Sequence, residues 1–430
     1  MDETVRKVSA EDINPRYNWG RALPAFGIMG VDFEERVDYR RLHRYRLSRV
    51  RQALESSELG ALLVFDVNNI RYITSTKIGE WERDKLCRWA LLARDGEPIL
   101  WDFGSAAVHH KLYTPWLLPE NCKAGLIGLR GTVNPAFGLM ERHAKEIASL
   151  LKQAGVHKMP IGVDIIEPPM LFELQKAGLK IADGQQIMLE AREIKNIDEI
   201  ALLNRAAAMV DGAYQLINEE LKPGVRENDI VGKVNEFLYR HGSDDVEAIN
   251  AISGERCNPH PHNFTDRMLR PGDQAFFDIL QAFMGYRTCY YRTFNVGRAT
   301  PVQHDAYKKA REWLDKAIAL IKPGVTTDKI CKVWPKAQDF GFPDEMTAFG
   351  LQFGHGLGLA LHERPIISRV VSLDHPTEIK EGMVFALETY CPAADGYSAA
   401  RIEEEVVVTD KGHRVITLFP AEELPISHRY

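Results

Sequence analysis

The feature that most restricts the fold of this chain is an internal repeat. The segment Lys222-Pro223-Gly224-Val225 recurs 100 residues later as Lys322-Pro323-Gly324-Val325. In each copy a helical pattern ends, Lys-Pro-Gly turns the chain, and a second amphipathic helical pattern begins. Chance produces one shared tetrapeptide far more easily than matched helices on both sides of it. The repeat therefore predicts a C-terminal domain, residues 189–430, made of two duplicated α/β halves.

Both predicted halves contain β-like segments that carry acidic residues. These segments are 274–280, 289–296, 383–388 and 405–409. Asp278 and Glu388 lie within two of them, and Glu403 lies just before the last. A buried carboxylate is costly unless it pairs with a cation or another polar group. We therefore expect the three carboxylates to meet in one site between the halves.

The first 188 residues alternate helical and strand patterns, which is typical of an α/β domain with its own core. Apolar spacing predicts helices over about 39–57 and 140–154. Residues 94–97 indicate a hairpin turn between two strands. The predicted strands are 61–66, 70–74, 89–93, 98–103 and 161–164. Residues 1–35 are expected to form an irregular arm that packs on a partner subunit.

Composition excludes several classes of function. A net charge of −6 disfavours sequence-independent binding to nucleic acid, which needs a basic surface. No apolar run reaches membrane-spanning length, and the acidic N-terminus does not resemble a signal peptide. The six cysteines are scattered without paired spacing, as in proteins of a reducing compartment. We expect a cytoplasmic protein that binds neither nucleic acid nor membrane.

A glycine-rich stretch over 354–365 carries two histidines, His355 and His362, with Glu363 directly after the second. Glycine allows a backbone to come close to its neighbours, and imidazole binds metals or transfers protons near neutral pH. The plainer interpretation is a glycine-rich turn with buried, hydrogen-bonded histidines.

Six segments in this order resemble the pita-bread family, which includes creatinase, aminopeptidase P, prolidase and methionine aminopeptidase. They are 272–278, Gly285-Tyr286, Arg292-Thr293-Phe294, 354–365, 381–388 and 401–409. The resemblance implies an N-terminal creatinase-like α/β domain over residues 1–188, followed by a pseudo-two-fold pita-bread α+β domain over 189–430.

Metallopeptidases of this family bind two metal ions through two Asp, one His and two Glu. Four of these positions match, as Asp278, His355, Glu388 and Glu403, but the bridging Asp is replaced by Cys289. A thiolate is a poor substitute in a site of hard oxygen ligands. The resemblance thus implies either no cofactor or one divalent metal ion. Alternatively, Cys289 is simply a small buried apolar residue.

Creatinase is the metal-free branch of the family, and Pro261-His262-Asn263 resembles its proton-shuttle segment. Tyr291 stands where creatinase has a catalytic glutamate. The catalytic residues implied are His262, His362, Glu388 and Tyr291. His362 would stabilise an oxyanion or bind a carboxylate. Alternatively, His260 and His262 belong to a surface loop without function.

A basic cluster in the N-terminal domain contains Arg71, Arg83, Lys85 and Arg88 beside Trp81. In dimers of the family, such residues reach into the neighbouring subunit and bind a substrate carboxylate. We therefore expect a homodimer in which Arg71, Arg83, Arg88 and His260 bind a small-molecule substrate. Alternatively, the cluster is a solvated charged loop.

The resemblance implies a hydrolase that cleaves a C–N bond in a small non-peptide zwitterion, as creatinase does. One alternative is a mononuclear-metal lyase that resembles dimethylsulfoniopropionate lyase, because this likeness extends into the N-terminal segments 65–66, 69–72 and 99–102. Another is a metallopeptidase acting on Xaa-Pro bonds. A third is a binding module without catalysis, which the retained histidines and glutamates disfavour.

Overall fold

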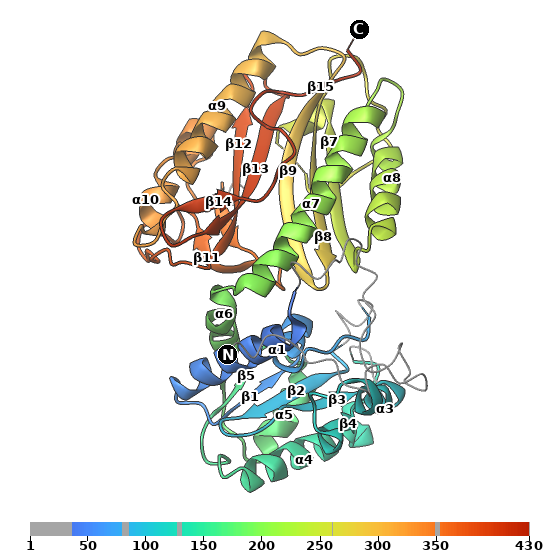
Figure 1. Ribbon diagram of the computed structural model, residues 1–430, viewed down its shortest axis with the longest axis vertical. Helices are drawn as coiled ribbons and strands as arrows, with labels where there is room; N and C mark the ends of the chain where they lie inside the picture. Colours follow the sequence, from blue (N-terminus) through green and yellow to red (C-terminus); the bar gives the residue numbers. More distant parts are fainter. Residues whose placement is uncertain (1–36, 80–85, 127–130, 260, 349–352, 430) are drawn as a thin grey trace, which may run out of the picture.

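The computed structural model describes residues 37–79, 86–126, 131–259, 261–348 and 353–429 and shows two domains joined through helix α6 (Gln185–Glu193) (Figure 1). The expected boundary at residues 188 and 189 lies within this helix. The predicted N-terminal arm, His260, Trp81, Arg83 and Lys85 lie outside the described residues. Within the described ranges, no helix is long and apolar enough to span a membrane.

The N-terminal domain contains a six-stranded sheet of order β4-β3-β2-β1-β5-β6. Its strands are β1 (Ala61–Val64), β2 (Trp89–Ala93), β3 (Ile99–Asp102), β4 (Cys122–Ala124), β5 (Ile161–Val163) and β6 (Ile181–Asp183). Its helices are α1 (Tyr39–Glu55), α2 (Val67–Thr74), α3 (Gly104–Tyr113), α4 (Leu139–Gln153) and α5 (Pro168–Lys176). The predicted helices and the β2–β3 hairpin are confirmed, with β2 antiparallel to β3.

The predicted strand over 70–74 is wrong, because this segment is the second half of helix α2. The Asp66 carboxylate accepts hydrogen bonds from the backbone N–H groups of Asn68 and Asn69 and so caps the helix. Ile70 and Ile73 lie three positions apart and are both buried, as one face of a helix requires. A five-residue apolar run does not by itself distinguish a strand from a buried helix.

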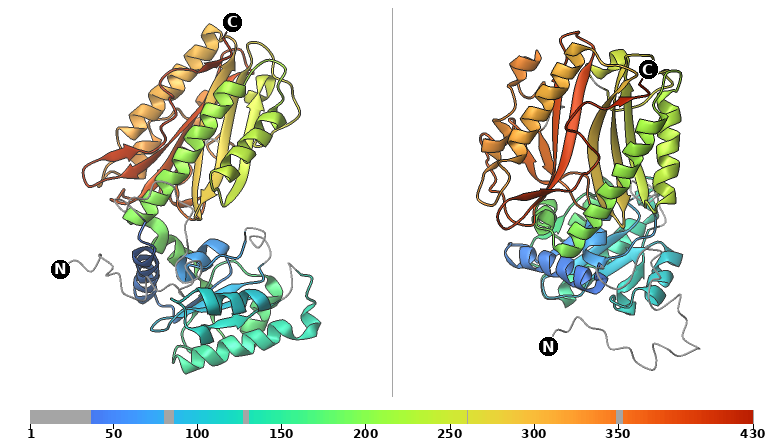
Figure 2. Two further views of the ribbon diagram at one scale, coloured as in Figure 1. Left: turned by 45° about the vertical axis from the view of Figure 1, so that its right-hand side comes forward. Right: turned by 45° about the horizontal axis from the view of Figure 1, so that its top comes forward.

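The C-terminal domain places two sheets side by side, with helices along both (Figures 1 and 2). One sheet has the order β15-β9-β8-β7 and the other β11-β10-β12-β13-β14. The strands of the first are β7 (Asp245–Ser253), β8 (Gln274–Phe283), β9 (Tyr286–Val296) and β15 (Ile426–Ser427). Those of the second are β10 (Gly354–Gly356), β11 (Glu363–Ile367), β12 (Val384–Pro392), β13 (Ala399–Val408) and β14 (His413–Val415). Glu403 is thus within β13 rather than before it.

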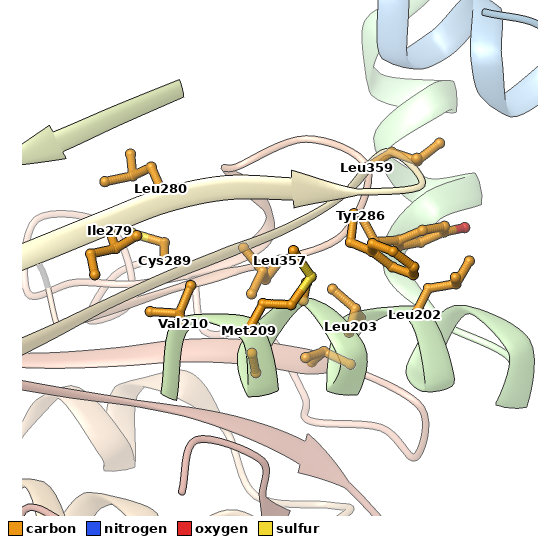
Figure 3. Packing of buried hydrophobic residues seen from close by; sticks show 14 of the residues in the cluster. Leu202, Leu203, Met209, Val210, Ile279, Leu280, Tyr286, Cys289, Leu357 and Leu359 are labelled. Carbon is orange, nitrogen blue, oxygen red and sulfur yellow. The ribbon is translucent and has the colours of Figure 1, made fainter. Parts of the chain in front are cut away.

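Four α-helices and four short 3-10 helices complete the described elements. Helices α7 (Ile197–Glu220) and α8 (Glu227–Arg240) contact the first sheet, and α9 (Pro301–Ile318) and α10 (Thr327–Cys331) contact the second. The 3-10 helices are η2 (Pro119–Asn121), η3 (Pro135–Phe137), η4 (Gly254–Cys257) and η5 (Ala337–Phe340). Leu202, Leu203, Met209 and Val210 of α7 are buried against the β8–β9 side of the domain (Figure 3).

The predicted repeat is visible in the backbone. Gly224 and Gly324 have φ angles of +91° and +85°, which glycine adopts more easily than other residues. Their N–H groups donate to the carbonyls of Leu269 and Ile379, at 2.9 Å in both halves. Helix α10 has only 5 residues against 14 in α8. We attribute its early end to Pro335, because a proline ring clashes with the carbonyl four residues earlier, here that of Cys331, and cannot continue a helix.

Candidate active site

Strand register brings the acidic residues of each half to one face of its sheet. In β8 and β9, Asp278 is directly opposite Tyr291, and Cys289 is opposite Leu280, two positions along from Asp278. In β12 and β13, Glu388 is directly opposite Glu403. Side chains two apart on a strand, or opposite each other across a pair, share a face.

The two halves meet at these residues. Ligand atoms of Cys289 from the first half and of His355 and Glu403 from the second lie within 4.8 Å of one another. The charges of Asp278 and Glu388 both help to raise the pKa of Glu403, after the larger effect of burial. The carboxylates therefore lie in one buried site, as the sequence predicts.

The glycines of 354–365 are required by close backbone contacts rather than by positive φ angles. Strand β10 lies between β11 and β12. A Cβ on Gly354 would lie 2.9 Å from the carbonyl oxygen of Ala386, and one on Gly356 would overlap the backbone of Arg364. A Cβ on Gly358 would lie 2.5 Å from the Glu363 carboxylate. The tight packing fixes His355 against the centre of the second sheet.

His355 and His362 lie against each other, with ring centroids 4.2 Å apart. The Nδ1 atom of His355 lies 2.9 Å from the carbonyl oxygen of Gly356, which suits a protonated Nδ1. Burial lowers the pKa of each ring to about 4. Both imidazoles are therefore neutral near pH 7, the form in which a histidine binds metal.

Cys289, His355 and Glu403 form a buried group of metal-binding side chains. Neither carboxylate oxygen of Glu403 has a hydrogen-bond partner among the residues that the structure describes. The Cys289 thiol lies 3.5 Å from Oδ1 of Asp278, to which it donates. Burial, reinforced by neighbouring carboxylates, raises the pKa values of Cys289 and Glu403 well above their usual ranges. A cation would satisfy the Glu403 carboxylate and offset the repulsion among the neighbouring acidic groups, so the donor set fits a divalent metal ion.

Asp278 is surrounded by hydrogen-bond donors. Its Oδ2 accepts from Asn250 Nδ2 at 3.0 Å, its Oδ1 accepts from the Cys289 thiol, and Tyr291 also bonds to it. Burial nevertheless raises its pKa to about 6. A carboxylate engaged in this way has less capacity to bridge metal ions.

Arg401 is a site residue that sequence reasoning missed. It forms an ion pair with Glu388, and its guanidinium carbon lies 4.0 Å from the centre of the Tyr291 ring. Its side chain is almost fully buried. The sequence does contain an indication of this role, because Arg401 is two positions before Glu403 on the same strand and so shares its face.

His262 lies on an exposed segment close to the site. Partial burial and then the nearby charge of Arg401 lower its pKa, while Glu388 raises it. The segment is attached to β12 because Tyr390 donates a hydrogen bond of 2.6 Å to the side chain of Asn258. His262 is therefore placed between solvent and the buried carboxylates.

The described residues of the N-terminal basic cluster form ion pairs within their own chain. Arg88 is buried, lies 3.1 Å from the Asp102 carboxylate and donates to Thr76 at 2.7 Å. Arg71 pairs with Asp244 at 3.4 Å, beside the turn between β8 and β9. The structure does not bring either arginine to Asp278 or Glu403 of the same chain. The role of Arg71 in a partner's site stays a prediction.

Glu363, directly after His362, connects the glycine-rich stretch to the junction of the domains. Its buried carboxylate lies 2.9 Å from Lys195 Nζ and 3.3 Å from Arg192 Nε. Burial opposes ionisation, but the charges of Lys195 and Arg192 outweigh it and hold the pKa of Glu363 below its ordinary value. Arg192 also donates to Asn69 of α2 at 2.8 Å, so this contact reaches the N-terminal domain.

Comparisons with known proteins agree with this architecture. Residues 201–410 match the family model of metallopeptidase family M24. Dimethylsulfoniopropionate lyase DddP of Roseovarius nubinhibens is 26% identical over 422 residues, which span 95% of this chain and 92% of that protein. Xaa-Pro dipeptidase of Pyrococcus furiosus is 28% identical over 235 residues, 54% of this chain and 65% of its own length.

Solved structures show the same fold at lower identity. Dipeptidase PepE from Mycobacterium ulcerans has a TM-score of 0.72 at 23% identity, covering 91% of this chain and 100% of its own. Xaa-Pro dipeptidase from Bacillus anthracis has a TM-score of 0.71 at 21% identity, covering 89% and 99%. Residues 201–410 of the chain therefore match metallopeptidase family M24, and the chain has the two-domain pita-bread fold of these dipeptidases.

Proposed function

We propose that this M24 enzyme cleaves a C–N bond in a small non-peptide zwitterion and holds at most one divalent metal ion. The observation that carries the proposal is Cys289 at the position of the bridging carboxylate, where its thiol donates to Asp278. A two-metal peptidase needs a hard carboxylate there to offset the repulsion between two cations about 4 Å apart.

The charges of the site suit a cationic group. Asp278, Glu388 and Glu403 are three buried carboxyl groups, whereas Arg401 is the cation that pairs with one of them. The excess of carboxyl groups over cations in the site favours binding of either a metal ion or the cationic end of a substrate. A metal ion held by Cys289, His355 and Glu403 would act as a Lewis acid toward a bound substrate.

The remaining roles follow from position. His262, between solvent and Glu388, can carry a proton to the leaving nitrogen, because an imidazole exchanges protons readily near neutral pH. His362, neutral and beside His355, can donate a hydrogen bond to a developing oxyanion or to a substrate carboxylate. Tyr291, held between Asp278 and Arg401, orients both.

A second candidate is a lyase acting on a sulfonium acid. It is favoured by the full-length similarity to dimethylsulfoniopropionate lyase, whereas the similarity to the Pyrococcus furiosus dipeptidase spans about half of the chain. A sulfonium group is also a cation and would suit the same carboxylates.

The test compares three substrate classes with the purified full chain: guanidino or quaternary ammonium carboxylates, a sulfonium carboxylate, and Xaa-Pro dipeptides. Proton NMR follows consumption, and elemental analysis gives the metal content of the same sample. Turnover of the nitrogen zwitterions supports the hydrolase, and release of a thioether from the sulfonium acid supports the lyase instead. Dipeptide cleavage with two tightly bound metal ions would refute both.

Replacing His262 with alanine is expected to lower kcat by about 10²–10⁴-fold with little change in KM, because general acid–base catalysis contributes that much. The matched control is His375→Ala, since His375 is exposed and lies outside the site. Equal activity of the two variants on the true substrate would remove His262 from the mechanism.

We also propose that the chain forms a homodimer in which Arg71 contributes to the partner's site, whereas Arg88 is buried against Asp102 of its own domain and is not available for this role. One chain has a mass of 48.7 kDa, and light scattering at micromolar concentration should give twice this mass. A monomer under these conditions would contradict this proposal.

A further inference from the structure

We infer that Cys289 is a metal ligand, and that the thiolate makes the site selective for one thiophilic divalent ion such as Zn²⁺ or Co²⁺. This inference concerns the metal of the proposed function. It can be tested without any turnover, so the two can fail separately.

The geometry of the group is the first support. One ligand atom from each of Cys289, His355 and Glu403 falls within 4.8 Å of the others. Ligands at about 2.0–2.3 Å from a common zinc ion lie closer together than this bound, so small side-chain movements on binding would complete the coordination. Three protein ligands of the S, N and O types also leave a fourth position for water or substrate, as in catalytic zinc sites.

The second support is independent of the cysteine. Glu403 is fully buried, and both of its carboxylate oxygens lack hydrogen-bond partners within the described part of the chain. A native structure rarely leaves a buried carboxylate in this state unless something else satisfies it. A metal ion at the Cys289–His355–Glu403 group would satisfy it directly.

The backbone around Cys289 is also held in place. Glu405 Oε1 accepts hydrogen bonds from the backbone N–H of Cys289 at 2.7 Å and from the Thr288 hydroxyl at 2.6 Å. Glu405 lies two positions after Glu403 on β13, so one strand supplies a ligand and a support for another ligand. Metal sites commonly orient their ligands through such outer contacts.

The thiol changes which metals fit. Sulfur ligands favour Zn²⁺ and other borderline or soft ions, whereas Mg²⁺ and Mn²⁺ prefer carboxylate oxygen. On binding, the thiol proton passes to solvent and a metal–sulfur bond replaces the hydrogen bond to Asp278. Cys289 would then bind the metal ion directly rather than serve only as a small buried apolar residue.

The experiment uses the full chain, stripped with a chelator and then titrated with Co²⁺ alone. We expect one Co²⁺ per chain and an intense near-ultraviolet band from thiolate-to-cobalt charge transfer. Cys289→Ser should abolish this band and weaken Zn²⁺ binding by more than the about 10–100-fold typical of losing an outer contact. Cys331→Ser is the matched control, because Cys331 is also buried but belongs to α10, and it should retain the band.

A third variant, Cys289→Asp, should shift preference toward Mn²⁺ and raise the number of ions bound per chain. The inference is overturned if the unmodified protein binds Co²⁺ without the charge-transfer band, if it binds none, or if Cys289→Ser keeps the band. Turnover of a small zwitterion by Cys289→Ser would leave the proposed function standing while removing the thiolate from it.

Discussion

Glu363→Gln is expected to destabilise the protein by about 3–5 kcal/mol, the usual cost of removing one partner from a buried ion pair. The substitution keeps the shape of the side chain but leaves Lys195 and Arg192 as unpaired buried cations, since their side chains are only 1% and 3% exposed. Chemical denaturation should show the loss, preferably followed by a probe in each domain because two-domain chains need not unfold in one step.

The same change should disturb catalysis, because Glu363 directly follows His362 and fills the space beside Gly358. We expect a lower kcat in addition to the lower stability. Replacing both Glu363 and Lys195, as Glu363→Gln with Lys195→Met, should recover part of the stability by removing one unpaired charge. The control Glu97→Gln breaks an exposed pair with Arg51 and should have no measurable effect. A Glu363→Gln variant as stable as this control would contradict the assigned role.

The sequence predicts that three carboxylates meet, because they lie in strands whose alternation is readable. Asp278, Glu388 and Glu403 are polar in apolar runs; Glu388 lies opposite Glu403, and the charges of Asp278 and Glu388 both act on Glu403. One failure comes from dependence on a partner that is distant in sequence. Glu363 directly follows His362 in the sequence, but its pairing with Arg192, 171 positions earlier, follows from no local pattern.

Two other misses are local. Residues 70–74 form the end of helix α2 because Asp66 caps it, and apolar composition alone did not reveal this. Arg401 begins the segment 401–409 that resembles the family, yet its ion pair with Glu388 depends on the register of β12 against β13. The spacing after Asp278 places Cys289 at the bridging position of the motif, but only the fold shows that its sulfur lies near ligand atoms of His355 and Glu403.

Replacing Glu403 with glutamine is expected to abolish metal binding and lower turnover by at least about 10³-fold, as loss of a member of a catalytic unit does. At the same time it should stabilise the metal-free protein. Burial and then the charges of Glu388 and Asp278 raise the pKa of Glu403 well above its usual value. The folded chain therefore binds this proton more tightly than the unfolded chain.

The raised pKa makes the stability of the metal-free protein depend on pH. Above the unfolded value of about 4.5, folding stability falls as pH rises, by about 1.4 kcal/mol per unit, until the folded carboxyl also ionises. Glutamine does not titrate, so the advantage of Glu403→Gln should be small at pH 5 and clear at pH 8. Urea denaturation of chelator-treated samples at both pH values measures this.

The neighbouring Glu404 provides the matched control with the opposite sign. Its carboxylate pairs with the buried Arg292 at 2.9 Å and with Arg311 at 2.8 Å. Glu404→Gln should therefore destabilise the metal-free protein while leaving the metal ligands in place. If Glu403→Gln were instead the less stable of the two at pH 8, or still bound Zn²⁺ as the unmodified chain does, Glu403 would be an ordinary buried acid with partners of its own. If the two substitutions shift the free energy of unfolding in opposite directions, Glu403 lowers the stability of the metal-free protein and is retained in β13 as a ligand for a cation.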